Sequence, residues 1–377
     1  MRMGRRVRVL LLFGGRSAEH DVSRMTAVAV ARALDPAKYD VVPVAITTEG
    51  AWLLAEEARA LLASSRDALP AAFAIEGAPV DINTQPGGGE LVPLGGGPGD
   101  PRVDVVLPLL HGPYGEDGTI QGLLDTVGLP YVGSGVLGSA VGMDKVMMKR
   151  AFLGCGLPTP RFLALREGHP VAPFCREVER ELGLPCFVKP ANMGSSVGVS
   201  KARDRAELEA AIELALAYDE WLLAEEAVTG REIEVAVLGD DPPEASVPGE
   251  VVPAADFYDY ADKYEDGRAQ LLAPAPLSEA QATDVRRLAV AGFEACRCEA
   301  MARVDFFLEE TGPARGFLLN ELNTIPGFTP ISMYPRLWQV SGVTYPELID
   351  RLIRLAIERH QRRAARAGRQ RPVRPPL

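Results

Sequence analysis

The feature that most constrains how this chain folds is a pair of apolar segments in its last third, residues 301–308 and 317–322. Both segments have the residue content of β-strands, and each carries a pair of polar residues spaced by two positions, the second pair ending at residue 323. Successive side chains of a strand point to opposite faces, so the two members of each pair lie on one face of their strand. If the two strands are neighbours in a sheet, these polar residues meet on a single surface.

Four polar side chains would gather on that surface. Arg303 and Asp305 share one face of the first strand, and Glu321 and Asn323 share one face of the second. Two carboxylates and an amide oxygen, without His or Cys, suit a hard ion such as Mg²⁺ or Mn²⁺. So few protein ligands leave room for substrate phosphates to complete the ion's shell. The alternative is two strands with ordinary solvated faces.

Length, charge and cysteine content limit the class of protein. A chain of 377 residues predicts two or three domains. Its net charge of −11 does not favour a nucleic-acid surface. The five cysteines lack CxxC spacing and a histidine cluster, which indicates reduced thiols and a cytoplasmic protein rather than a zinc site. No stretch reaches the ~18 apolar residues that a membrane span needs.

Strands and helices alternate in the first part of the chain. Apolar runs at 7–13, 41–46 and 103–110 predict strands, and a helix is expected at about 20–34. This alternation favours an α/β fold whose first domain is a doubly wound parallel sheet. The Gly/Pro-rich stretch 85–101 is expected to be a mobile surface loop.

Two further units follow, the last of them α+β in character. The second is expected to contain helices at 143–153 and 204–218, strands at 184–189 and 221–226, and a Gly/Ser loop at 192–199. The third is expected to be an antiparallel sheet with flanking helices that ends near residue 360. The predicted division is an N-terminal α/β domain at 1–133, a central unit at 134–226, a C-terminal unit with the metal site at 227–360, and a disordered basic tail at 361–377.

Three loops carry residues suited to ligand binding. Lys189 ends a strand and is followed by Gly194, Ser195 and Ser196, so backbone N–H groups and a lysine charge could meet phosphate oxygens. The order differs from a Walker A loop, and an ordinary hairpin turn is the alternative. Glu19 and His111 lie in loops that follow buried strands, where open α/β sheets bind ligands. Helix capping by Glu19 and a structural role for His111 remain open.

One aromatic and acidic segment, 256–267, has neither helix nor strand periodicity. Its tyrosines and single lysine are typical of a lid that closes over a site.

Together these motifs resemble the D-alanine–D-alanine ligase family of the ATP-grasp superfamily. The resemblance covers residues 13–360 and rests on five blocks in the family's order: 14–23, 111–122, 143–145, 189–198 and 320–327. It implies a three-domain ATP-grasp fold. It also implies a ligase that phosphorylates one D-alanine with ATP and joins it to a second D-alanine, for peptidoglycan precursor synthesis.

The resemblance also implies a role for each site residue. Two Mg²⁺ (or Mn²⁺) ions are expected on Asp305, Glu321 and Asn323, and ATP on Lys145, Lys189, Ser196, Glu225, Glu232 and Lys263. Substrate contacts are expected from His111, Ser332 and Met333, and catalytic ones from Glu19, Ser195, Tyr264, Arg303 and Gly327.

The partners it implies are two D-alanine molecules, ATP and a second copy of the chain in a homodimer. Tyr264 favours the dipeptide product, whereas a D-alanine–D-lactate or D-alanine–D-serine ligase is the alternative within the family. Alternatives from other classes are a nucleotide-binding regulatory module without catalysis and an oxidoreductase. The presence of Arg303 and Asp305 argues against the first, and the absence of GxGxxG argues against the second.

Overall fold

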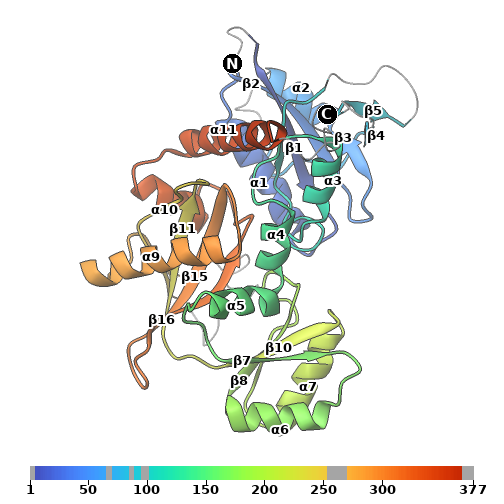
Figure 1. Cartoon of the computed structure of the whole chain (residues 1–377). Helices are drawn as coiled ribbons and strands as arrows, with labels where there is room; N and C mark the ends of the chain where they lie inside the picture. The colour runs from blue at the N-terminus through green and yellow to red at the C-terminus, as the bar shows by residue number, and fades with distance from the viewer. Residues whose placement is uncertain (1–4, 65–69, 85–88, 95–101, 253–269, 367–377) are drawn as a thin grey trace, which may run out of the picture.

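The protein is described by a computed structural model that covers residues 5–64, 70–84, 89–94, 102–252 and 270–366. Three sheets are arranged as three units (Figure 1). No helix within these described ranges is both long enough and apolar enough to cross a lipid bilayer.

The first unit is a six-stranded sheet in the order β5-β4-β3-β2-β1-β6. Its strands are β1 (Val7–Gly14), β2 (Tyr39–Ile46), β3 (Trp52–Leu54), β4 (Ala78–Ile82), β5 (Leu91–Pro93) and β6 (Val105–Pro108). Its helices are α1 (His20–Ala33), α2 (Glu56–Ser64) and α3 (Thr119–Val127). The central strands β2, β1 and β6 are parallel as predicted, and β1 is buried over almost its whole length.

Two expectations for this unit need correction. The sheet is mixed, because β3, β4 and β5 add to it in antiparallel fashion. The stretch 85–101 is not entirely a loop, since β5 lies within it and the side chain of Leu91 is buried. The sequence signal was hidden because β5 is only three residues long and stands between two Gly/Pro-rich runs.

The second unit is an antiparallel sheet in the order β7-β10-β8-β9, with two helices beside it. Its strands are β7 (Phe162–Arg166), β8 (Cys186–Pro190), β9 (Ser200–Ala202) and β10 (Trp221–Glu226), and its helices are α6 (Val171–Glu181) and α7 (Arg205–Leu216). Two short helices, α4 (Val136–Met143) and α5 (Lys145–Gly154), lie between this unit and the others (Figure 1).

The start of the helix predicted at 143–153 is therefore wrong, because α5 begins at Lys145. The chain breaks at Asp144, which has an extended backbone and whose side chain accepts a hydrogen bond from the Met147 N–H at 2.9 Å. Asp144 thus caps α5 and separates it from α4.

The third unit is the predicted antiparallel sheet, in the order β14-β13-β11-β15-β16 with β12 beside β11. Its strands are β11 (Arg231–Leu238), β12 (Glu244–Ala245), β13 (Gly249–Val252), β14 (Gln270–Leu272), β15 (Met301–Glu309) and β16 (Gly316–Asn323). Its helices are α9 (Glu279–Ala295), α10 (Met333–Val340) and α11 (Tyr345–Ala364). Because α11 continues to Ala364, residues 361–364 are helical and not part of a disordered tail, and residues 367–377 lie outside the described residues.

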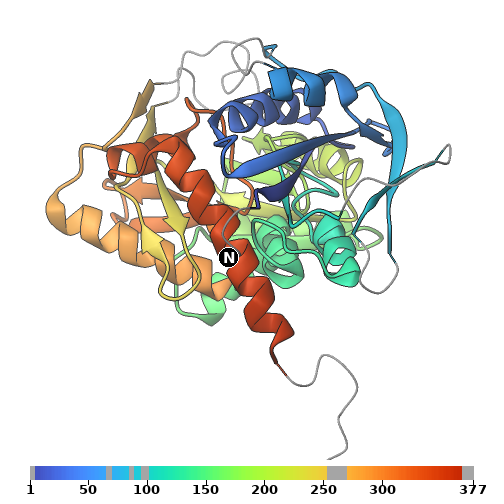
Figure 2. The ribbon, with the colours of Figure 1, turned by 90° about the horizontal axis from the view of Figure 1, so that it is seen from above.

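The last helix packs against the first unit. Seen from above, α11 runs between the first unit and the third sheet (Figure 2). One hydrophobic core holds Val9 and Leu11 of β1 together with Leu348, Leu352 and Ile353 of α11. The two ends of the chain therefore share a core, which fixes the first unit relative to the third.

Candidate active site

The predicted polar surface exists on β15 and β16. The two strands are antiparallel neighbours, with Arg303 directly opposite Asn323 and Asp305 directly opposite Glu321. Opposite residues of an antiparallel pair lie on the same face, so all four side chains share one surface. All four are half-buried, whereas the residues between them, Val304 and Leu322, are buried in the core.

A dense set of contacts holds this surface. Arg303 donates to both oxygens of Asp305, Nε to Oδ1 at 2.8 Å and Nη2 to Oδ2 at 2.7 Å. Asn323 Nδ2 donates to Asp305 Oδ2 at 3.0 Å, and Glu234 Oε2 lies 3.3 Å from Arg303 Nε. Burial opposes the charge of Arg303, but Asp305 and Glu234 outweigh it and hold its pKa well above the usual range.

The donor set fits hard divalent ions. Asp305, Glu321 and Asn323 offer two carboxylates and one amide, and Glu234 adds a third carboxylate nearby. Within the described ranges no three His, Cys, Asp or Glu side chains form a ready-made cage for a metal ion. An ion held here would therefore need further oxygens from water or phosphate, as Mg²⁺ usually does.

Lysines of β8 and α5 lie near this surface. Lys189 on β8 donates to Glu225 Oε1 on β10 at 2.7 Å, and Lys149 on α5 lies 2.5 Å from Glu225 Oε2. Lys145, at the start of α5, donates to the Met193 carbonyl at 2.5 Å. Burial alone would raise the pKa of Glu225, but the two lysines outweigh it and hold that pKa below its usual value.

The Gly/Ser loop reaches from the second unit to the first. Ser195 Oγ donates to Glu19 Oε1 at 2.5 Å, so two residues of the predicted catalytic set are in contact. Ser195 and Ser196 have left-handed backbones, with φ of 47° and 60°. The approach is close, since a Cβ atom on Gly194 would lie 3.0 Å from Glu19 Oε2.

His111 faces the third unit. Its Nδ1 lies 3.0 Å from the Ile325 carbonyl oxygen, and its buried Nε2 has no hydrogen-bond partner within the described residues. A buried polar atom without a partner is unusual in a native protein. Such an atom is suited to a hydrogen bond with a bound ligand.

The loop after β16 brings together the remaining predicted substrate contacts. Ser332 Oγ accepts a hydrogen bond from the Thr329 N–H at 3.1 Å. A Cβ atom on Gly327 would lie 3.2 Å from the same oxygen, so the two residues are adjacent. Met333 is buried and is the first residue of α10, where backbone N–H groups point out of the helix and favour an anion.

Not every predicted residue can be placed. Lys263, Tyr264 and the rest of the predicted lid 256–267 lie outside the described residues. Glu232 lies on β11 opposite Phe307, and its charge acts on Lys189.

The sequence prediction missed three buried charged residues, Lys149, Glu234 and Glu116. Glu116 accepts hydrogen bonds from the Gly112 N–H at 2.7 Å and from the Ile325 N–H at 2.9 Å, so it ties the His111 loop to the loop after β16. The sequence does contain a partial indication of each of these residues. Lys149 follows Lys145 by one helical turn, Glu234 shares the strand face of Glu232, and Glu116 lies in the motif that contains His111.

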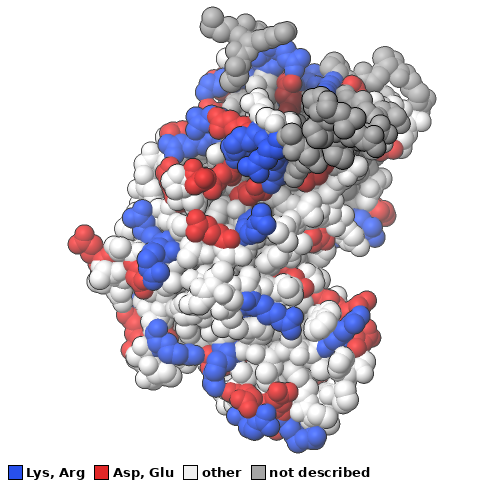
Figure 3. All heavy atoms as spheres, in the orientation of Figure 1, with Lys and Arg blue, Asp and Glu red and all other residues white. Residues whose placement is uncertain are grey.

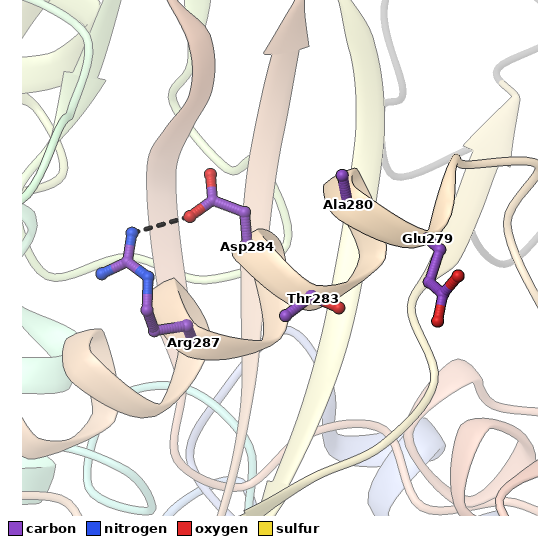
Figure 4. Close-up of a pocket in the computed structure, with 5 residues that line it drawn as sticks. All are labelled: Glu279, Ala280, Thr283, Asp284 and Arg287. Carbon is purple, nitrogen blue, oxygen red and sulfur yellow. Dashed lines mark hydrogen bonds and ion pairs between the residues drawn. The ribbon is translucent and has the colours of Figure 1, made fainter.

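A surface depression of about 570 Å³ lies on one helix, α9, apart from these residues (Figure 4). It is lined by Glu279, Ala280, Thr283, Asp284 and Arg287. Asp284 and Arg287 form an ion pair of 2.7 Å with each other. None of the residues predicted for the site lines this depression, and it is not the candidate active site.

Two family models and a curated relative all assign this chain to one protein family. The family model described as "D-ala D-ala ligase N-terminus" matches residues 8–134, and "D-ala D-ala ligase C-terminus" matches residues 151–354. A D-alanine–D-alanine ligase of Geobacillus kaustophilus is 48% identical over 362 residues, covering 94% of this chain and 96% of that protein.

Solved structures are similar over the same length. The D-alanine–D-alanine ligase of Coxiella burnetii has a TM-score of 0.80 and 35% identity, covering 96% of this chain and 97% of the other. The VanG D-Ala:D-Ser ligase of Enterococcus faecalis has a TM-score of 0.81 and 31% identity, covering 93% and 100%. With its polar strand pair, its lysines and its Gly/Ser loop in place, the chain belongs to the D-alanine–D-alanine ligase family, with the ATP-grasp fold.

Proposed function

We propose that the protein is a D-alanine–D-alanine ligase that uses ATP to make D-alanyl-D-alanine for peptidoglycan precursors. The observation that carries the proposal is the shared face of Arg303, Asp305, Glu321 and Asn323, opposite one another on β15 and β16 in a chain of this family. A carboxylate oxygen of one D-alanine attacks the γ-phosphorus of ATP, so an acyl O–P bond forms and ADP leaves as the bond to its β-phosphate oxygen breaks. The amine of a second D-alanine then attacks the acyl phosphate, a C–N bond forms, and phosphate leaves as the C–O bond breaks.

Asp305, Glu321 and Asn323 would hold two Mg²⁺ (or Mn²⁺) ions. The ions, when bound, neutralise the charge of the transferred phosphoryl group. The excess of carboxylates over guanidinium on this surface supports the assignment, because the cluster of Asp305, Glu321, Glu234 and Arg303 carries net negative charge.

The nucleotide is proposed to lie between the second and third units. Lys145, Lys189 and Lys263 would bind phosphate oxygens, together with the backbone N–H groups around Ser195 and Ser196. Glu225 and Glu232 would bind the adenine amino group and the ribose hydroxyls. The contact of Lys189 with Glu225 supports this assignment, because it puts a phosphate lysine beside a base-binding carboxylate.

The two D-alanines are proposed to bind on the first and third units. Glu19 would hold the ammonium group of the first, and the unpartnered Nε2 of His111 would orient it. The Ser332 hydroxyl and the Met333 N–H would hold the carboxylate of the second. Arg303 and the Gly327 N–H would stabilise the oxyanion of the tetrahedral intermediate.

Tyr264 is proposed to complete the set with Glu19 and Ser195 and to favour an amine as the second substrate. We expect Tyr264→Phe to raise the ratio of D-alanyl-D-lactate to D-alanyl-D-alanine when both acceptors are present, because the tyrosine hydroxyl is lost from that set. Mass spectrometry of the products measures the ratio. A ratio equal to that of the wild type would contradict the assignment. A matched control is Tyr218→Phe on the second unit, where the tyrosine is exposed.

The remaining proposals concern the whole protein. We propose a cytoplasmic enzyme that acts as a homodimer, with domains at 1–133, 134–226 and 227–360. On the face shown in Figure 3, the positive and negative side chains of the described residues are interspersed, which gives no reason to expect a nucleic-acid partner.

The decisive experiment is phosphate release from ATP by the purified protein with D-alanine and Mg²⁺ as the only additions. We expect one phosphate released for each D-alanyl-D-alanine formed, and loss of both signals when EDTA removes the metal. ATP binding without turnover would favour the regulatory module. D-alanyl-D-serine or D-alanyl-D-lactate as the preferred product, in assays with each acceptor, would favour the alternative ligases.

A further inference from the structure

Lys149 is buried at the nucleotide side of the proposed site, and the proposed mechanism gives it no task. Its side chain is 1% exposed. Its ammonium nitrogen lies 2.5 Å from Glu225 Oε2, donates to the Asn320 carbonyl at 3.0 Å and donates to Thr159 Oγ1 at 3.3 Å. Two of its three N–H donors are thus used by neutral oxygens, and the contact with Glu225 is an ion pair. Lys149 is therefore fixed in place by α5, β10, β16 and the segment before β7.

Lys189 approaches the same carboxylate from the other side with fewer contacts. Its nitrogen lies 2.7 Å from Glu225 Oε1, and its one other acceptor among the described residues is Asn320 Oδ1 at 3.4 Å. Its side chain is 12% exposed, so it can turn towards a ligand. One carboxylate thus stands between two ammonium groups, and each carboxylate oxygen meets one of them.

This sharing has an electrostatic consequence. Lys149, Lys189 and Glu225 together carry one net positive charge. If Lys149 alone neutralises Glu225, Lys189 keeps its charge for an anion. If Lys149 were uncharged, Lys189 would be the only cation in contact with a buried carboxylate. Moving it away would then leave that carboxylate unpaired, which is strongly unfavourable.

We propose that Lys149 is a positioning residue of the nucleotide site: it is the permanent counter-ion of Glu225 and thereby releases Lys189 to bind the polyphosphate of the nucleotide. This inference rests on the proposed function, because it takes the ligand of Lys189 to be a polyphosphate. It goes further in giving a task to a lysine that does not itself touch the nucleotide.

The test uses the full chain and magnesium tripolyphosphate, a probe without a base, so that contacts of Glu225 with adenine play no part. We expect Lys149→Met to weaken tripolyphosphate binding roughly 10- to 100-fold, measured by titration calorimetry, because one charge-assisted contact to phosphate is lost. Glu225→Gln should not weaken it, since Lys189 is then free. The double variant K149M/E225Q should return to wild-type affinity, because no carboxylate remains to hold Lys189.

This rescue separates the proposal from a purely structural role, which would make the double variant as weak as Lys149→Met or weaker. The matched control is Thr159→Val, which removes one contact of Lys149 without changing any charge and should leave the affinity unchanged. If Lys149→Met does not fold, the double variant carries the test, because it removes Lys149 together with its counter-ion. Wild-type affinity in Lys149→Met, or weak binding by the double variant, would overturn the inference.

Magnesium ATP is titrated into the wild type in parallel. Wild-type protein that binds neither ATP nor tripolyphosphate would contradict the proposed function itself. Wild-type protein that binds both, with Lys149→Met binding them equally well, would overturn only the role of Lys149.

Discussion

At the scale of single residues, Arg303 is the side chain whose loss should matter most for chemistry. It donates to both oxygens of Asp305 and lies on the polar face of β15, where we propose that it stabilises an oxyanion. We expect Arg303→Met to lower kcat roughly 10²- to 10³-fold, as removal of an oxyanion donor does elsewhere. Steady-state phosphate release measures the effect, and thermal unfolding checks that the variant is folded. Arg287→Met, at the exposed ion pair of α9, should leave kcat unchanged; an equal loss in both variants would contradict the role.

Glu116 should make stability depend on pH. Burial, reinforced by the charge of Glu19, raises the pKa of Glu116 to about 8. The unfolded value is about 4.3. The folded protein keeps the proton over a range in which the unfolded chain releases it, so this residue lowers stability progressively as pH rises from about 4.3 to about 8.

Glu116→Gln removes this titration. The NH₂ group of the new amide will face one of the two backbone N–H donors at every pH. This lowers the free energy of unfolding by an amount that does not depend on pH. On top of that constant, the variant should gain unfolding free energy relative to the wild type as pH rises through the window. Urea unfolding at about pH 5 and about pH 8 measures the difference, and a difference that does not change with pH would show that Glu116 is ionised throughout.

At the scale of elements, the cap of α5 links stability to nucleotide binding. Asp144 accepts a hydrogen bond from the Met147 N–H and begins the helix that carries Lys145 and Lys149. Asp144→Ala should lower the free energy of unfolding by about 1 kcal/mol. It should also raise KM for ATP, because the first turn that positions Lys145 loosens. Asp204 caps α7 in the same way, through the Glu207 N–H at 2.9 Å. Asp204→Ala should therefore lose similar stability with an unchanged KM for ATP, and equal KM values in the two variants would refute the link.

The elements also show what sequence can predict. Arg303 and Asp305 are two positions apart, which predicts that they share one face of a strand, because strand alternation is a local property. The structure confirms this shared face. The break at Asp144 was missed because a capping aspartate between two apolar helical runs does not interrupt the periodicity. Lys149 was missed because its burial depends on Glu225, 76 residues further along the chain. Non-local pairing of this kind leaves no periodic signal.

At the scale of the whole molecule, Arg359 should couple the first unit to the third. Its buried guanidinium on α11 donates to the Gly133 carbonyl at 2.5 Å and to the Tyr131 carbonyl at 2.7 Å. Arg359→Met leaves both acceptors without a partner and should cost roughly 2–5 kcal/mol of unfolding free energy. Calorimetry should then show the first unit melting before the rest. Arg354→Met, exposed on the same helix, should melt as the wild type does; a similar downward shift there would mean that Arg359 has no special coupling role.

The core shared by β1 and α11 has a consequence for synthesis. Val9 and Leu11 of β1 lie in the same hydrophobic core as Leu348, Leu352 and Ile353 of α11, which are translated more than 330 residues later. A nascent chain therefore exposes part of the core around β1 until α11 has been synthesised. Chaperone protection of β1 during translation, and insolubility of fragments truncated before α11, follow from a core whose members lie so far apart in the sequence.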